Sequence, residues 1–169
     1  MEFVKIILLT LVMGMCTALG IMKAKKYKLR VIDLQEIKKA LNLAITKMRY
    51  TYEPLPELFK EISKDLNDNM ANIFIKAHTF METLNAGQAW EKAIDESNNN
   101  FTNEDINIIK GLSKLLGKTD LEGQLMQIEL TIKLIDEQLI EATNLQTKNT
   151  KLYKTLGATI GLALMIIFI

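Results

Sequence analysis

The chain has 169 residues, of which 49% are hydrophobic, and its formal net charge is +1. This length allows one modest domain with its own core. Residues 31–147 hold 12 basic and 19 acidic residues, a net charge of −7. Such a domain lacks the surplus of Lys and Arg that neutralises phosphates, which argues against nucleic-acid binding. The single cysteine, Cys16, excludes an intramolecular disulfide.

The N-terminal segment has the pattern of a membrane anchor. Residues 6–22 form a run of 17 positions without a charged side chain, which is the lower end of what crosses a bilayer as a helix. A cleaved signal peptide has a basic start and a shorter apolar run, whereas here Glu2 and Lys5 cancel and the basic cluster follows the run. We therefore expect residues 1–22 to be a retained transmembrane anchor with the N-terminus outside.

Positive charge marks both borders of the central domain. Residues 23–30 form a basic juxtamembrane segment, and residues 148–155 form a basic collar. By the positive-inside rule, both clusters place residues 31–147 in the cytoplasm. We expect the basic side chains to contact anionic lipid headgroups. They are Lys23, Lys25, Lys26, Lys28, Arg30, Lys148, Lys151 and Lys154.

The C-terminal segment, residues 156–169, predicts a second transmembrane helix. Its 14 residues span about 21 Å at helical rise, so the basic collar must snorkel or the bilayer must thin locally. Gly157 and Gly161 have the GxxxG spacing that lets another membrane helix approach closely. The alternative is that this spacing arose by chance.

The central domain predicts six helices and no strand, because apolar residues recur at helical spacing. Pro54 and Pro56 end the first helix, Gly87 is expected to terminate the third, and Thr102 with Asp105 predicts a capping box for the fifth. Short connections make consecutive helices antiparallel. The predicted fold class is all-α, a six-helix antiparallel bundle flanked by an N-terminal and a C-terminal transmembrane helix.

The last predicted helix organises the chain. Thr119 and Glu122 predict a capping box at its start. One apolar stripe, with steps of four and three residues, is expected to be buried. The stripe contains Leu121, Leu125, Ile128, Ile132, Ile135, Leu139 and Ala142. We expect the same helix to continue from the bundle into the C-terminal apolar segment.

No pattern in the central domain supports catalysis. The stretch from Leu116 to Thr119 ends like a phosphate-binding loop, but Leu112 stands where the first glycine is required, and the stretch follows a helix. His78 is the only histidine and has no cysteine in the central domain beside it, so no transition-metal site is predicted. We expect Trp90 to be a core residue. We therefore predict that the protein is not an enzyme and binds no cofactor.

The antiparallel order sorts the loops between the two ends of the bundle. Those after the first, third and fifth helices lie far from the membrane, and those around Asn67 and residues 98–100 lie near it. We name the far set the distal tip and predict that it binds a partner protein. The alternative is that its residues are only turn formers. The distal tip consists of Glu53, Pro54, Leu55, Pro56, Gly87, Gly117, Lys118, Thr119 and Asp120.

Several short motifs, taken in order, resemble the stage III sporulation protein AB family. The motifs are the basic-flanked N-terminal anchor, the PLP turn at Pro54 to Pro56, Gly87 with Ala89 and Trp90, Leu116-Gly117-x-Thr119-Asp120 with Gln124 after it, and Leu152-Tyr153-Lys154-x-Leu156-Gly157. The resemblance covers essentially the whole chain. That family is itself similar to the cytoplasmic domains of the type II secretion platform protein F, which are six-helix antiparallel bundles.

The resemblance implies a platform component of the sporulation channel between mother cell and forespore, located in the mother-cell membrane that surrounds the forespore. Type II platform proteins couple a cytoplasmic ATPase to a membrane assembly. The expected partners are therefore an ATPase like stage III sporulation protein AA and other membrane proteins of the channel. Platform proteins carry two such bundles and this chain carries one, which leaves a homo-oligomer open. The alternative function is a membrane sensor or scaffold with a helical-bundle domain.

Overall fold

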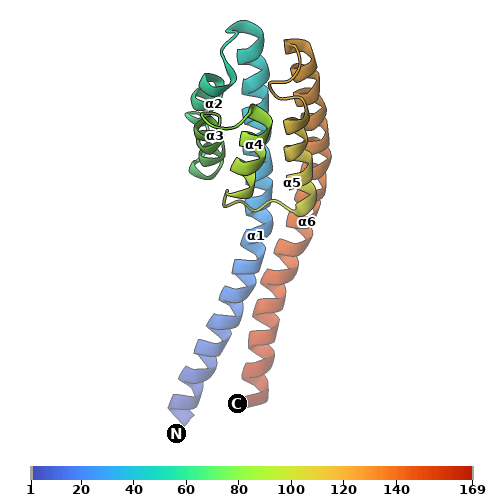
Figure 1. Ribbon diagram of the computed structural model, residues 1–169. Coiled ribbons are helices and arrows are strands. Elements are labelled where there is room, and N and C mark those ends of the chain that lie inside the picture. Colours follow the sequence, from blue (N-terminus) through green and yellow to red (C-terminus); the bar gives the residue numbers. More distant parts are fainter. Residues whose placement is uncertain (1, 169) are drawn as a thin grey trace. The chain divides into compact units, whose positions relative to one another are not determined.

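The computed structural model describes residues 2–168, and Figure 1 shows their course. Side chains are described except at residues 2–10, 13, 16, 17, 154, 157, 158, 160–162 and 164–168. Residues 2–168 contain no strand, so the all-α prediction is confirmed for them. The elements are α1 (Glu2–Tyr50), α2 (Leu55–Ser63), α3 (Asp68–Phe80), α4 (Ala86–Asp95), α5 (Asn103–Lys110), the 3-10 helix η1 (Gly111–Lys114) and α6 (Leu121–Phe168).

The chain divides into two compact units. One consists of Met1–Val31 and Glu141–Ile169, and the other is the bundle unit, Ile32–Ile140. α1 and α6 are 49 and 48 residues long, and each belongs to both units. The prediction that the last helix continues into the C-terminal apolar segment is confirmed.

An aromatic cluster fills the centre of the bundle unit. Phe59 of α2, Phe74 of α3 and Trp90 of α4 meet edge to face, with ring centroids 5.3 to 5.5 Å apart. Such pairs stabilise a core by about 0.5–1.5 kcal/mol each beyond the area they bury. The indole nitrogen of Trp90 donates a hydrogen bond of 2.9 Å to the carbonyl of Ile109 in α5. The prediction that Trp90 is a core residue is confirmed.

Side-chain caps start α3, α4 and α5, whereas α2 follows Pro54 without one. Asn67 accepts a hydrogen bond from the amide of Met70 at the start of α3, and Asn85 accepts one from the amide of Gln88 at the start of α4. The predicted capping box at the start of α5 is confirmed, because the side chain of Thr102 accepts from the amide of Asp105 and the carboxylate of Asp105 accepts from the amide of Thr102.

Two carboxylates of α1 hold the loops at one end of the bundle. Asp33 is 2% exposed, and its Oδ2 accepts hydrogen bonds from the backbone amide and the side-chain amide of Asn100, at 2.9 and 2.8 Å. Glu36 accepts a bond of 3.0 Å from the amide of Asn67. The loops around residues 67 and 100 therefore share one end of the bundle, as the antiparallel order predicts.

The prediction that Gly87 terminates the third helix is wrong. α3 ends at Phe80, and Gly87 lies in the first turn of α4, where it is buried. A Cβ atom at this position would lie 2.4 Å from the carbonyl oxygen of Ser113 in η1. The residue is glycine because two backbones approach each other here.

The predicted capping box of Thr119 and Glu122 is also wrong. α6 begins at Leu121, and Oδ1 of Asp120 accepts a hydrogen bond of 3.0 Å from the amide of Gly123. The hydroxyl of Thr119 instead donates to the carbonyl of Asp120. The cap is one residue later than expected because Asp120 is itself a strong N-cap residue. In the predicted apolar stripe, the buried members are Leu125, Ile128, Ile135 and Ala142.

In the other unit, the side chains of α1 and α6 contact each other. The rings of Tyr27 and Tyr153 stack with centroids 6.1 Å apart. Among the described residues, no helix has a stretch both long and apolar enough to cross a membrane. Most side chains of the two predicted anchors, with those of Cys16, Gly157 and Gly161, lie outside the described part of the chain.

We predict that Gly87→Ala destabilises the bundle by about 1–3 kcal/mol, because the new methyl group would overlap the carbonyl of Ser113. Urea unfolding of the full chain in mild detergent, followed by circular dichroism, measures this change. The matched control is Gly111→Ala. Gly111 has helical φ and ψ and no atom closer than 4.0 Å to a new Cβ, so alanine should stabilise by about 0.4–1 kcal/mol. Equal stability of the two variants would contradict the prediction.

Candidate functional site

Three loops far apart in the sequence meet at the distal tip. Gly117 has φ +71°, and a Cβ atom there would lie 3.1 Å from Cβ of Ala86 and 3.4 Å from Cδ1 of Leu55. Leu55 follows the loop after α1, Ala86 begins α4, and Gly117 lies between η1 and α6. The structure therefore brings together all three predicted loops, at the end of the bundle opposite Asp33 and Asn100.

Hydrogen bonds from one side chain hold the turn between η1 and α6. The side-chain amide of Gln124 donates to the carbonyl of Thr119 at 3.0 Å, and its oxygen accepts from the amide of Gly117 at 3.1 Å. Lys118 also donates to the carbonyl of Ser113, at 3.3 Å. The turn is thus ordered by the bundle, and an ordered surface loses less entropy when a partner binds.

The chain leaves α1 through a strained turn. Tyr52 has φ +52°, a left-handed conformation that costs a non-glycine residue about 1–3 kcal/mol. The side chain of Tyr52 is 76% exposed and that of Tyr50 is 80% exposed. Oε2 of Glu53 is buried and has no hydrogen-bond partner among the described atoms. Strain and an unsatisfied acceptor in one turn are features that concentrate at binding sites.

The nine predicted tip residues differ in accessibility. Gly87 is buried, so it shapes the tip from within and offers no surface to a partner. The carbonyl oxygen of Pro56 lies 3.0 Å from Nδ1 of His78, so the only histidine of the sequence makes a hydrogen bond within the fold. Glu53, Leu55 and Pro56 are half-buried. The exposed members are Pro54, Gly117, Lys118, Thr119 and Asp120.

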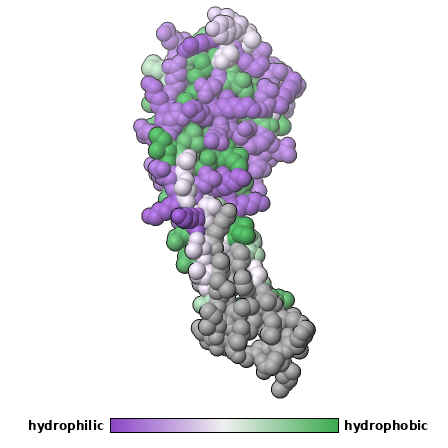
Figure 2. Space-filling view, turned by 180° about the vertical axis from the view of Figure 1, so that it is seen from behind, coloured by the Kyte–Doolittle hydropathy of each residue, from purple (hydrophilic) through white to green (hydrophobic). Residues whose placement is uncertain are grey.

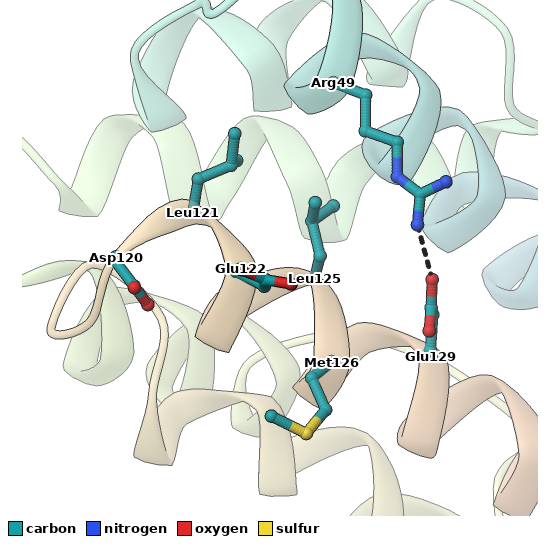
Figure 3. Close-up of a pocket in the computed structure, with 7 residues that line it drawn as sticks. All are labelled: Arg49, Asp120, Leu121, Glu122, Leu125, Met126 and Glu129. Carbon is teal, nitrogen blue, oxygen red and sulfur yellow. Dashed lines mark hydrogen bonds and ion pairs between the residues drawn. The ribbon is translucent and has the colours of Figure 1, made fainter.

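Two adjoining grooves lie beside the tip. We name the larger one, of about 710 Å³, the α1–α6 groove. Figure 3 shows Arg49 of α1 extending toward Glu129 of α6. The side chains of Leu121 and Leu125 point to the side of the groove on which Arg49 lies. The guanidinium of Arg49 lies 2.7 Å from Oε1 of Glu129. The groove is lined by Arg49, Asp120, Leu121, Glu122, Leu125, Met126 and Glu129.

The second groove, of about 270 Å³, shares Leu121 with the first. Its lining includes Tyr52 and Glu53, which are the strained residue and the unsatisfied carboxylate. Sequence analysis missed most residues of both grooves, because they belong to helix surfaces that only the fold brings together. Met126 gave one signal, since it is a large apolar residue outside the buried stripe and is 65% exposed.

The predicted membrane-surface residues differ in exposure. Arg30 is 7% exposed and pairs with Glu141 at 3.8 Å, so its guanidinium is engaged within the protein. The side chain of Lys154 lies outside the described part of the chain. The exposed members are Lys23, Lys25, Lys26, Lys28, Lys148 and Lys151. Each basic cluster also contains a tyrosine, and a hydrogen bond with the side chain of Tyr153 raises the pKa of Tyr27 above its usual value.

Tyr50 and Tyr52 next to the tip and Met126 in the adjoining groove are exposed, and aromatic and methionine side chains are enriched at protein interfaces. Among the side chains that the structure describes, no group of three or more His, Cys, Asp or Glu residues is placed to hold a metal ion.

We predict that Gln124→Ala loosens the turn of residues 117–120, because it removes two hydrogen bonds of about 1 kcal/mol each. Trypsin should cut after Lys118 roughly fivefold faster or more, as measured by peptide mapping of the full chain. Gln127→Ala is the matched control, because Gln127 bonds to the carbonyl of Gly111 and not to this turn. Equal cleavage in the two variants would show that Gln124 does not hold the turn.

Comparison with known proteins gives one consistent result. The family model described as stage III sporulation protein AB matches residues 5–169. Stage III sporulation protein AB of Bacillus subtilis (strain 168) is 24% identical over 155 residues, covering 88% of this chain and 89% of that protein. A solved structure of stage III sporulation protein AB has the same fold, with a TM-score of 0.64 and 19% identity over 71% of this chain and 98% of that one. The chain belongs to the stage III sporulation protein AB family.

Proposed function

We propose that this chain is a non-enzymatic platform component of the sporulation channel between mother cell and forespore, and that its distal tip docks a cytoplasmic ATPase to the membrane complex. The observation that carries the proposal is the meeting of three loops, around Leu55, Ala86 and Gly117, in one surface. The turn around Gly117 is held in place by Gln124. Membership of a sporulation protein family supports the cellular role.

Membrane anchoring is part of the proposal. Residues 1–22 and 156–169 are the anchors, and the bundle lies in the cytoplasm. The exposed lysines at residues 23–28 and 148–151 would contact anionic headgroups at about 1 kcal/mol each. We leave Arg30 out of this set because it is buried and paired.

The proposed partner is the ATPase of the same complex, which resembles stage III sporulation protein AA, together with other membrane proteins of the channel. Exposed tyrosines support a protein partner at the tip, because tyrosine is enriched where interfaces gain most of their binding free energy. Tyr50 and Tyr52 are the most exposed aromatic residues that the structure describes. A homo-oligomer would place two bundles in one assembly and is compatible with this role.

We predict that Tyr50→Ala and Thr119→Arg each weaken binding of the purified ATPase by about tenfold, the loss expected for about 1.4 kcal/mol at an interface. Neither residue lines a groove, and both are exposed, so the melting temperature should not change. Biolayer interferometry with the full chain in detergent measures the affinity. The control is Ile75→Ala, because Ile75 is 49% exposed on α3.

Two results would count against docking at the tip. Unchanged affinity in both variants would mean that the tip residues are only turn formers. No binding by the unmodified chain would remove this ATPase as the direct partner.

We predict that a cysteine at Asn98 is protected from a membrane-impermeant maleimide in intact cells and is labelled after lysis, in a Cys16→Ser background. Asn98 is exposed, whereas the neighbouring Asn99 makes two hydrogen bonds that a substitution would break. Glu2→Cys is the positive control, because the N-terminus is expected outside. Labelling at residue 98 in intact cells would favour an external sensor or scaffold and would exclude a cytoplasmic partner.

A further inference from the structure

The α1–α6 groove combines an apolar lining with an acidic rim. Leu121, Leu125 and Met126 supply the apolar part, and Met126 is 65% exposed. Leu121 is half-buried and Leu125 is buried, and a large exposed apolar side chain beside such residues forms the kind of patch that a partner covers. At about 710 Å³, the groove has the size of clefts that receive several side chains.

The rim carries a surplus of negative charge. Its carboxylates belong to Asp120, Glu122 and Glu129, and its only cation is Arg49, which pairs with Glu129. The carboxylate of Asp120 accepts a hydrogen bond from the amide of Gly123, and Asp120 is exposed. Glu122 is exposed and has no ion pair or hydrogen bond among the described residues. Two carboxylates therefore face the groove without a cation.

The adjoining groove extends the surface toward the strained turn, and its lining includes Tyr52 and Glu53. Oε2 of Glu53 is buried without a hydrogen-bond donor among the described atoms, so a docking partner does not reach that oxygen. Because Leu121 lines both grooves, one segment can lie over both.

We infer that the α1–α6 groove receives a segment of a partner protein that carries at least two Lys or Arg side chains next to a bulky apolar side chain. This inference rests on the proposed function and specifies its partner chemistry. The cations pair with Glu122 and Asp120, and the apolar side chain covers Leu121, Leu125 and Met126. Phosphates and lipid headgroups are anionic and are repelled by the same rim.

The charge of the whole domain supports a basic partner. Residues 31–147 carry a net charge of −7, which steers basic segments toward the bundle and repels acidic ones. Figure 2 shows that hydrophilic residues cover most of one face of the bundle and that hydrophobic patches interrupt them. An apolar patch with an acidic border selects a partner by charge and by shape, because each part rejects a different class of wrong partner.

The test uses the full chain in detergent micelles, with the purified sporulation ATPase as the probe. Glu122→Lys should weaken binding about tenfold or more, since a like charge at an interface is strongly unfavourable. Met126→Ala should also weaken it. The matched controls lie on the outer face of α6. Glu137→Lys makes the same charge change at an exposed glutamate about 22 Å along the helix, and Ile140→Ala truncates a residue that is 67% exposed. Both controls should bind as the unmodified chain does.

Each outcome separates the inference from the proposed function. Loss of binding in Glu122→Lys and Met126→Ala, with both controls intact, supports the groove. Equal loss in Glu122→Lys and Glu137→Lys would show diffuse charge attraction and would overturn it. Binding that depends on Tyr50 and Thr119 but not on Glu122 or Met126 would leave docking at the tip intact and overturn the groove. No binding by the unmodified chain would overturn both.

Discussion

The bundle depends on one buried side chain, the indole of Trp90. Its ring packs against Phe59 of α2 and Phe74 of α3, and its nitrogen bonds to the carbonyl of Ile109 in α5. A buried indole nitrogen without a partner would cost about 1–3 kcal/mol, so the hydrogen bond fixes α4 in one position on α5. From that position, Gly87 at the start of α4 meets the backbone of Ser113. The meeting of Ala86 and Gly117 at the distal tip follows from the same packing.

The two ends of the bundle differ in whether a buried carboxylate oxygen has a hydrogen-bond donor. At one end, Asp33 is buried and accepts two hydrogen bonds from Asn100, which closes the loop onto α1. At the other end, Glu53 keeps a buried oxygen without a donor and Tyr52 holds a left-handed backbone. A folded chain retains such costs where the surrounding structure enforces them. The contrast explains why we assign binding to the distal end and a structural role to the other.

Binding at the distal tip requires an ordered surface with the right charge. The turn from Gly117 to Asp120 is held by Gln124, and the N-terminal turn of α6 is capped by Asp120. These bonds keep Glu122 and Met126 at fixed places beside α1. The ion pair of Arg49 and Glu129 joins α1 to α6 across the groove and is itself worth about 1 kcal/mol or less at the surface. The pair engages the only cation of the groove lining, so that no cation of the lining is left to pair with Asp120 and Glu122.

Local chemistry was sufficient to predict the all-α class, the antiparallel order of the helices and the capping box of Thr102 and Asp105. Each of these depends on residues close in the sequence or on the period of the apolar pattern. The role of Gly87 could not be predicted, because it depends on the carbonyl of Ser113, which belongs to another helix.

The start of α6 could not be decided by spacing either, because Thr119 and Asp120 are both good caps and only one set of bonds forms. The α1–α6 groove could not be predicted from the sequence, because it is lined by Arg49 and Glu129, which are 80 positions apart. Periodicity identifies which face of a helix is buried. Which exposed faces then come together is set by how the helices pack, and that depends on contacts between residues distant in the chain.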